Sequence, residues 1–167
     1  MKKLSMVAVA LMVLAGVAYA SSIGVPWFID NSSAASGYPP ASGITTLIYL
    51  KNNTAEDIEC DITYFSPNGT NLTEGASAPT AFVVPASSTV GFRPVAYDPA
   101  TVTNGQESAT GVLVPDRPRY VSEDATSNLK NGAAVIEWNG GANDIQGMVA
   151  TLGVNGFAYA HLLPPGE

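Results

Sequence analysis

A two-residue alternation of apolar and polar side chains constrains this chain more than any other feature of its sequence. In residues 58–65 every second residue is apolar or aromatic and the residues between them are acidic or polar: Ile58, Cys60, Ile62 and Tyr64 alternate with Glu59, Asp61 and Thr63. Successive side chains of a strand point to opposite faces, so this pattern predicts a half-buried antiparallel strand. Residues 133–138 show the same alternation.

Clusters of Gly, Pro, Asn, Asp and Ser separate several such stretches. We expect strands at residues 25–30, 44–51, 58–65, 81–84, 89–93, 111–114, 133–138, 146–154 and 157–163. Residues 44–51 and 58–65 are the clearest predicted pair, and Asn155-Gly156 is a predicted hairpin loop. One helical turn is expected at residues 124–129, but no long amphipathic helix. The pattern therefore predicts an all-β fold, a single antiparallel β-sandwich of the Ig-like or jelly-roll-like kind.

The first twenty residues have the organisation of a bacterial-type signal peptide. Lys2 and Lys3 precede an apolar stretch, and Ala18-Tyr19-Ala20 is a small-x-small cleavage motif before Ser21. The apolar stretch is shorter than the ~20 residues that span a bilayer, so we expect cleavage, and no transmembrane anchor after it, over a retained anchor. The predicted organisation is a signal peptide at 1–20, one sandwich domain at 21–163 and an extended tail at 164–167. The mature chain is expected to be exported, to the periplasm or outside the cell.

Charge and cysteine content exclude some classes of function. Cleavage would leave five basic and fourteen acidic residues, a net charge of −9, which disfavours nucleic acid and anionic membrane surfaces as partners. Cys60 is the only cysteine, so no disulfide can form within the chain. We expect a buried, inert thiol, with an intermolecular bridge as the alternative.

Residues suited to catalysis are scarce. His161 is the only histidine and lies in a predicted strand, where we expect it at the surface or end of a sheet. No hydrolase, zinc, phosphate-loop or dinucleotide motif occurs, so we expect no enzyme and no cofactor. The alternative is a hydrolase that uses two carboxylates, for which Glu137 and Asp144 are the least implausible pair.

Aromatic and cationic residues supply the candidates for ligand binding. Tyr38 and Tyr120 are expected in loops, where rings can contact a ligand, whereas Trp27 is predicted to lie in the core more than in a binding face. Arg117 and Arg119 form the one cationic spot, suited to a carboxylate or an anionic sugar. A solvated loop is the favoured interpretation of that spot.

Acidic residues form a weak candidate for a metal site. Asp57, Glu59 and Asp61 fall at alternate positions and share one side of a strand. Calcium needs several converging oxygen ligands, which a flat strand does not supply alone, so a solvated face is favoured over a calcium site. The sequons at Asn31, Asn52, Asn68 and Asn71 are interpreted as turn residues.

Residues 22–92 carry a resemblance at the level of strands and turns. The matching pieces are Ser22-Ile23-Gly24, Trp27-Phe28-Ile29, Gly37-Tyr38-Pro39-Pro40, Leu50-Lys51-Asn52, Asp61-Ile62-Thr63-Tyr64-Phe65, Val83-Val84-Pro85-Ala86 and Phe92-Arg93. In these the chain resembles the sensory rhodopsin transducer family of small β-sandwich adaptors. The resemblance implies a non-enzymatic module, and it implies a homo-oligomer. A rhodopsin partner is not implied, because this chain has a signal peptide and longer loops.

These expectations combine into one functional prediction. The chain is expected to be an exported, non-catalytic binding or structural component of the cell envelope or extracellular space that self-associates. Its expected partners are further copies of itself, another envelope protein or a glycan. Carbohydrate recognition through loop aromatics is the first alternative, and carboxylate-based hydrolysis is the second.

Overall fold

The computed structural model describes residues 20–31, 42–74, 80–94, 112, 114–118, 131–154 and 158–166. Within these residues all regular secondary structure is β-strand. The strands are β1 (Ala20–Ile29), β2 (Ile44–Asn52), β3 (Ile58–Phe65), β4 (Ala81–Val84), β5 (Thr89–Phe92), β6 (Asn131–Asn139), β7 (Ile145–Gly153), β8 (Ala158–Leu163) and β9 (Pro165–Gly166).

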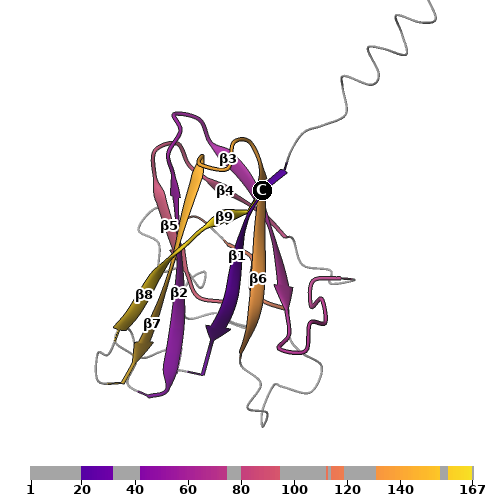
Figure 1. Ribbon diagram of the computed structural model, residues 1–167, viewed down its shortest axis with the longest axis vertical. Coiled ribbons are helices and arrows are strands. Elements are labelled where there is room, and N and C mark those ends of the chain that lie inside the picture. The colour runs from indigo at the N-terminus through magenta and orange to yellow at the C-terminus, as the bar shows by residue number, and fades with distance from the viewer. Residues whose placement is uncertain are drawn as a thin grey trace, which may run out of the picture.

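The strands form two antiparallel sheets that pack face to face (Figure 1). Sheet A has the order β4-β3-β6-β1-β9, and sheet B has the order β5-β2-β7-β8. The predicted all-β antiparallel sandwich is confirmed. No helix in the described part of the chain is long and apolar enough to cross a membrane.

The predicted strands differ from the structure in two places, and one predicted helical turn is not tested. β1 begins at Ala20, five residues earlier than predicted. Val112 and Val114 are described but lie outside any strand, although Val114 packs into the core. The helical turn expected at residues 124–129 lies outside the described residues.

The predicted pairing of residues 44–51 with 58–65 is wrong. The first segment lies in β2 of sheet B, between β5 and β7, and the second lies in β3 of sheet A, between β4 and β6. The connection therefore passes from one sheet to the other instead of forming a hairpin. Alternation predicted both strands, but it carries no information about which strand each one pairs with.

Asn52, at the end of β2, joins the two sheets through its buried side chain. Its Nδ2 donates to the carbonyl oxygens of Glu56 at 2.8 Å and of Val84 in β4 at 2.9 Å. Its Oδ1 accepts hydrogen bonds of 2.8 Å from the backbone nitrogen and the hydroxyl of Thr54. The amide is thus fully bonded within a site that excludes water.

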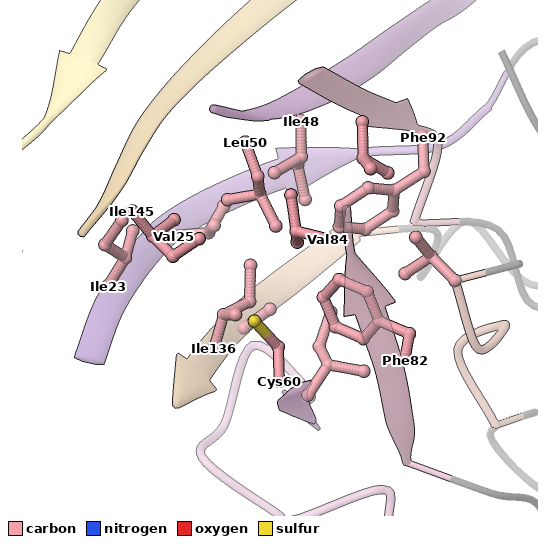
Figure 2. Close-up of a cluster of buried hydrophobic side chains, with 14 of the residues drawn as sticks. Ile23, Val25, Ile48, Leu50, Cys60, Phe82, Val84, Phe92, Ile136 and Ile145 are labelled. Atoms are coloured by element: carbon pink, nitrogen blue, oxygen red, sulfur yellow. The ribbon is translucent and has the colours of Figure 1, made fainter. Parts of the chain in front are cut away.

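The core is built from the inward-facing residues of both sheets (Figure 2). Sheet A contributes alternate residues of β3 and β6, as their sequence pattern predicts, and sheet B contributes Ile48 and Leu50 of β2. The rings of Phe82 and Phe92, one from each sheet, pack with centroids 6.3 Å apart. Cys60 lies within this core as a buried free thiol, so its expected burial is confirmed.

A β-bulge in β1 changes which residues face the core. The pairing of β1 with β6 shifts register between Val25 and Phe28, so both of these residues are buried while Pro26 and Trp27 are exposed. An extra residue in one strand reverses the alternation beyond it. Proline is tolerated at such a bulge because it has no N–H to donate to the ladder.

The last described residues form part of sheet A. Residues 164–167 were expected as an extended tail, but Pro165 and Gly166 form β9 and pair with Ile23 and Ser22 of β1. The C-terminal end therefore lies beside the start of β1 (Figure 1). The hydroxyl of Ser21 also donates to the carbonyl oxygen of Gly140 at 2.7 Å, which fixes this end of β1 to the β6–β7 turn.

Candidate functional site

Two large aromatic side chains of the described residues are exposed. Trp27 on β1 is 49% exposed and Tyr159 on β8 is 59% exposed. The prediction that Trp27 lies in the core is wrong, because the bulge at Pro26 turns its ring outward and places Phe28 inside. Trp27 lies on a strand of sheet A, and Tyr159 lies on the edge strand of sheet B. The proline next to Trp27 was the sequence signal that could have predicted this exposure.

Arg117 is buried, which corrects the prediction of a solvated loop at this position. It is 2% exposed, and its segment packs onto the sandwich through Val114 in the core and through the carbonyl oxygen of Pro115. A guanidinium buried to this degree is not presented on the surface to an anionic ligand. Arg119, Tyr38 and Tyr120 lie outside the described residues, so their candidacy stays a prediction.

The hydroxyl of Tyr64, in β3, binds this packed segment to the sandwich. It donates a hydrogen bond of 3.0 Å to the carbonyl oxygen of Pro115. Burial raises the pKa of Tyr64 strongly, the nearby Asp116 raises it further, and Arg117 opposes them. The phenol is therefore a neutral hydrogen-bond donor with a structural role.

The three acidic residues proposed as a calcium site do not converge. The carboxylate of Asp57 accepts a hydrogen bond of 2.8 Å from the backbone nitrogen of Ala86, and that of Asp61 accepts one of 3.1 Å from the hydroxyl of Thr80. Glu59 lies on the exposed face of β3. Among the described residues no cluster of three or more His, Cys, Asp or Glu side chains could hold a metal ion. Asp57 and Asp61 stabilise turns and strand ends instead.

The outer face of sheet A is acidic. Asp61 of β3 lies directly opposite Glu137 of β6, and Glu59 follows on the same face of β3. Like charges at directly opposite positions of two strands repel each other. The same carboxylates would also repel a second acidic surface that approached this face.

Glu137 and Asp144, the pair considered for hydrolysis, have separate surroundings. Glu137 is exposed on the outer face of β6. The carboxylate of Asp144 accepts a hydrogen bond of 2.6 Å from the backbone nitrogen of Gly141 and so closes the β6–β7 turn. Nothing in this arrangement favours the carboxylate-based hydrolase.

Cys60 and His161 are the remaining side chains of types that often act in catalysis. Burial, followed by the charges of Asp61 and Glu59, raises the pKa of the Cys60 thiol to about 12. A thiol of this kind is a poor nucleophile at neutral pH. His161 lies on the edge strand β8, as expected for a residue at the side of a sheet, and its ring packs against Tyr159 with centroids 5.5 Å apart.

The four sequon asparagines have structural roles at chain reversals. Oδ1 of Asn52, Asn68 and Asn71 accepts from the backbone nitrogen and the hydroxyl of the threonine two residues later. Oδ1 of Asn31 accepts from the backbone nitrogen of Ile44. The interpretation as turn residues is confirmed for Asn52, Asn68 and Asn71, since these bonds form Asx-turns.

The free edge of β8 is a surface feature that the sequence analysis did not single out. β8 pairs with β7 along all six of its residues, and no described strand pairs with its other side. Leu162 on this strand is 64% exposed. The absence of any charge or proline from residues 158–163 was the signal that could have identified this edge.

Comparisons of the chain with protein-family models, with curated proteins and with solved structures find no match.

Proposed function

We propose that the mature chain, Ser21 to Glu167, is an exported, non-catalytic β-sandwich that self-associates as a structural or adaptor component of the cell envelope or extracellular space. The observation that carries this proposal is the free edge of β8. An uncharged edge strand with an exposed Leu162 favours association with another strand.

Three carboxylates are hydrogen-bonded to the chain itself and the thiol is buried, which supports a binding role over a catalytic one. Asp57, Asp61 and Asp144 accept hydrogen bonds in turns and at strand ends, and the Cys60 thiol is buried. The resemblance to the sensory rhodopsin transducer family agrees with a sandwich adaptor and stays a prediction.

The proposed export is compatible with the paired residues of β1. Cleavage after Ala20 would remove one residue of the strand and leave the pairs from Ser21 to Ile29 in place.

Light scattering coupled to size-exclusion chromatography tests this proposal on residues 21–167 over a wide concentration range. We expect a mass greater than that of one chain, rising with concentration and unchanged by reductant, because Cys60 is buried. A monomer at every concentration would contradict self-association.

Glycan binding is the second candidate, and the exposure of Trp27 favours it. The ring of Trp27 is half exposed, and exposed rings can stack on the apolar faces of sugars. A glycan array followed by calorimetry on Trp27→Ala tests this candidate. Binding that is lost in Trp27→Ala and retained in Val83→Ala would support it.

A further inference from the structure

The described strands leave four sheet edges, and three of these edges are protected against pairing. β4 and β5 contain four residues each and are followed by Pro85 and by Arg93-Pro94. β9 contains two residues and begins with a proline. Its neighbour β1 is interrupted by the bulge at Pro26. Short strands, prolines, bulges and flanking charges are the usual protection against edge-to-edge association.

No proline, bulge or charged residue interrupts β8, although Pro164 follows it as Pro85 follows β4. β8 contains six residues, Ala158–Leu163, without proline or Asp, Glu, Lys or Arg. Along the side away from β7, every second residue directs its backbone N–H and C=O outward, where no described strand receives them. Its exposed side chains, Tyr159 and Leu162, lie on opposite faces of the strand, so both faces of an added strand would gain apolar contact.

The distribution of charge indicates what kind of strand fits this edge. β7 and β8 contain no Asp, Glu, Lys or Arg, whereas Glu59, Asp61 and Glu137 gather on the outer face of sheet A. A basic partner would be attracted to sheet A, and an acidic partner would be repelled by the whole molecule. The β8 edge suits an uncharged apolar strand, and β8 of a second copy is such a strand.

We propose that β8 pairs antiparallel with β8 of a second copy about a twofold axis, which joins two four-stranded B sheets into one eight-stranded sheet. This inference rests on the proposed self-association and names its surface. Residues that lie opposite each other in the two β8 strands must point to the same face of the joined sheet. A twofold axis that passes between the two Ala160 residues meets this requirement. Leu162 then lies opposite Ala158, and Tyr159 lies opposite His161 of the second copy.

The test compares two lysine substitutions at exposed positions on different edges. Leu162→Lys places a charge on β8, and Val83→Lys places one on β4, the opposite edge of the sandwich. We expect Leu162→Lys to weaken dimerisation about tenfold or more by light scattering, and Val83→Lys to leave it unchanged. Circular dichroism of each variant checks that the fold is retained.

A cysteine pair tests the register. In Ala160→Cys the two thiols meet at the axis, so mild oxidation is expected to give a covalent dimer. In Leu162→Cys the two thiols are four residues apart along the strands, about 13 Å, so no bridge is expected. Cys60 does not interfere, because it is buried.

The outcomes separate this inference from the proposed function. A wild-type dimer that survives Leu162→Lys would overturn the β8 interface, and one that gives no bridge in Ala160→Cys would overturn the proposed register; either result leaves self-association standing. A wild-type monomer at all concentrations would overturn both.

Discussion

The hydroxyl of Tyr64 in β3 donates a hydrogen bond of 3.0 Å to the carbonyl oxygen of Pro115, which lies 51 residues further along the chain. The ring of Tyr64 is fully buried and packs edge-on against Phe28 with centroids 6.2 Å apart. This bond fixes the segment around Val114 and Arg117 against the sandwich. The segment is therefore packed onto the sandwich, with Val114 in the core.

Removing the Tyr64 hydroxyl is expected to destabilise the protein. Tyr64→Phe keeps the ring and its packing but leaves the Pro115 carbonyl without this donor, which costs about 1–2 kcal/mol in the free energy of unfolding. Urea denaturation followed by circular dichroism measures the change. Tyr159→Phe is the control, since its side chain is exposed and a change beyond ~0.5 kcal/mol is not expected.

Replacing the buried Asn52 is expected to destabilise the protein more than replacing its exposed neighbour Asn53. Asn52→Ala removes the bonds to Glu56, Val84 and Thr54 and takes this donor away from the buried Val84 carbonyl, so we expect a loss of about 2–4 kcal/mol. Asn53→Ala removes one exposed bond of 3.0 Å, to the carbonyl oxygen of Asn143, and should cost less than about 1 kcal/mol. Equal losses of unfolding free energy in the two variants, measured by chemical denaturation, would contradict the role of Asn52 in joining the two sheets.

Cys60 is expected to be unreactive in the folded protein. Its thiol stays protonated at neutral pH because burial raises its pKa to about 12, so a thiol reagent should modify it only after unfolding. Titration with such a reagent, with and without guanidinium, measures this difference. Rapid modification of the native protein would show that the thiol is accessible.

The same shift predicts a loss of stability in alkali. Above about pH 8.5 the thiol of the unfolded chain loses its proton while the folded one keeps it, so the unfolded state binds fewer protons and stability falls as pH rises. The slope approaches about 1.4 kcal/mol per pH unit for one thiol. Denaturation of the wild type and of Cys60→Ala between pH 8 and 10 isolates this contribution, and parallel curves would contradict it.

The two tryptophans are expected to report different environments. Trp138 is 2% exposed, so Trp27→Phe should leave blue-shifted emission that acrylamide quenches weakly. Trp138→Phe should leave the red-shifted, easily quenched emission of Trp27. Trp138→Ala should also cost about 3–5 kcal/mol, because it opens a core cavity, whereas Trp27→Ala should cost far less. Similar quenching in the two phenylalanine variants would contradict the bulge in β1.

The sequence predicted best where local alternation decides the outcome. In β3 and β6 the burial of Cys60, Ile136 and Trp138 follows directly from a period of two, and Asn68 lies in a turn, as interpreted from the sequence. The prediction failed for Trp27 because one bulge shifts the alternation by a residue. It also failed to predict that β2 and β3 belong to different sheets, because partner choice depends on contacts far apart in the chain.

The candidate binding residues were harder to predict for a related reason. Arg117 was expected in a solvated loop because nothing in the sequence shows other polar groups converging on it, yet the distant Tyr64 holds its segment in place. No pattern local to residues 114–118 encodes that contact. The free edge of β8 likewise depends on strand order, which becomes known only from the assembled sheets.

The pairing of β9 with the start of β1 determines how the sandwich responds to tension. Ser22 and Gly166 are direct neighbours in antiparallel strands, so a force that pulls the two ends apart acts across the ladder and opens it one residue pair at a time. The two pairs of β9 would part first, and β1 of the mature chain would then peel from β6 beginning at the pair of Ser21 with Trp138. Stretched by its ends, this sandwich should unzip at low force, well before its core shears.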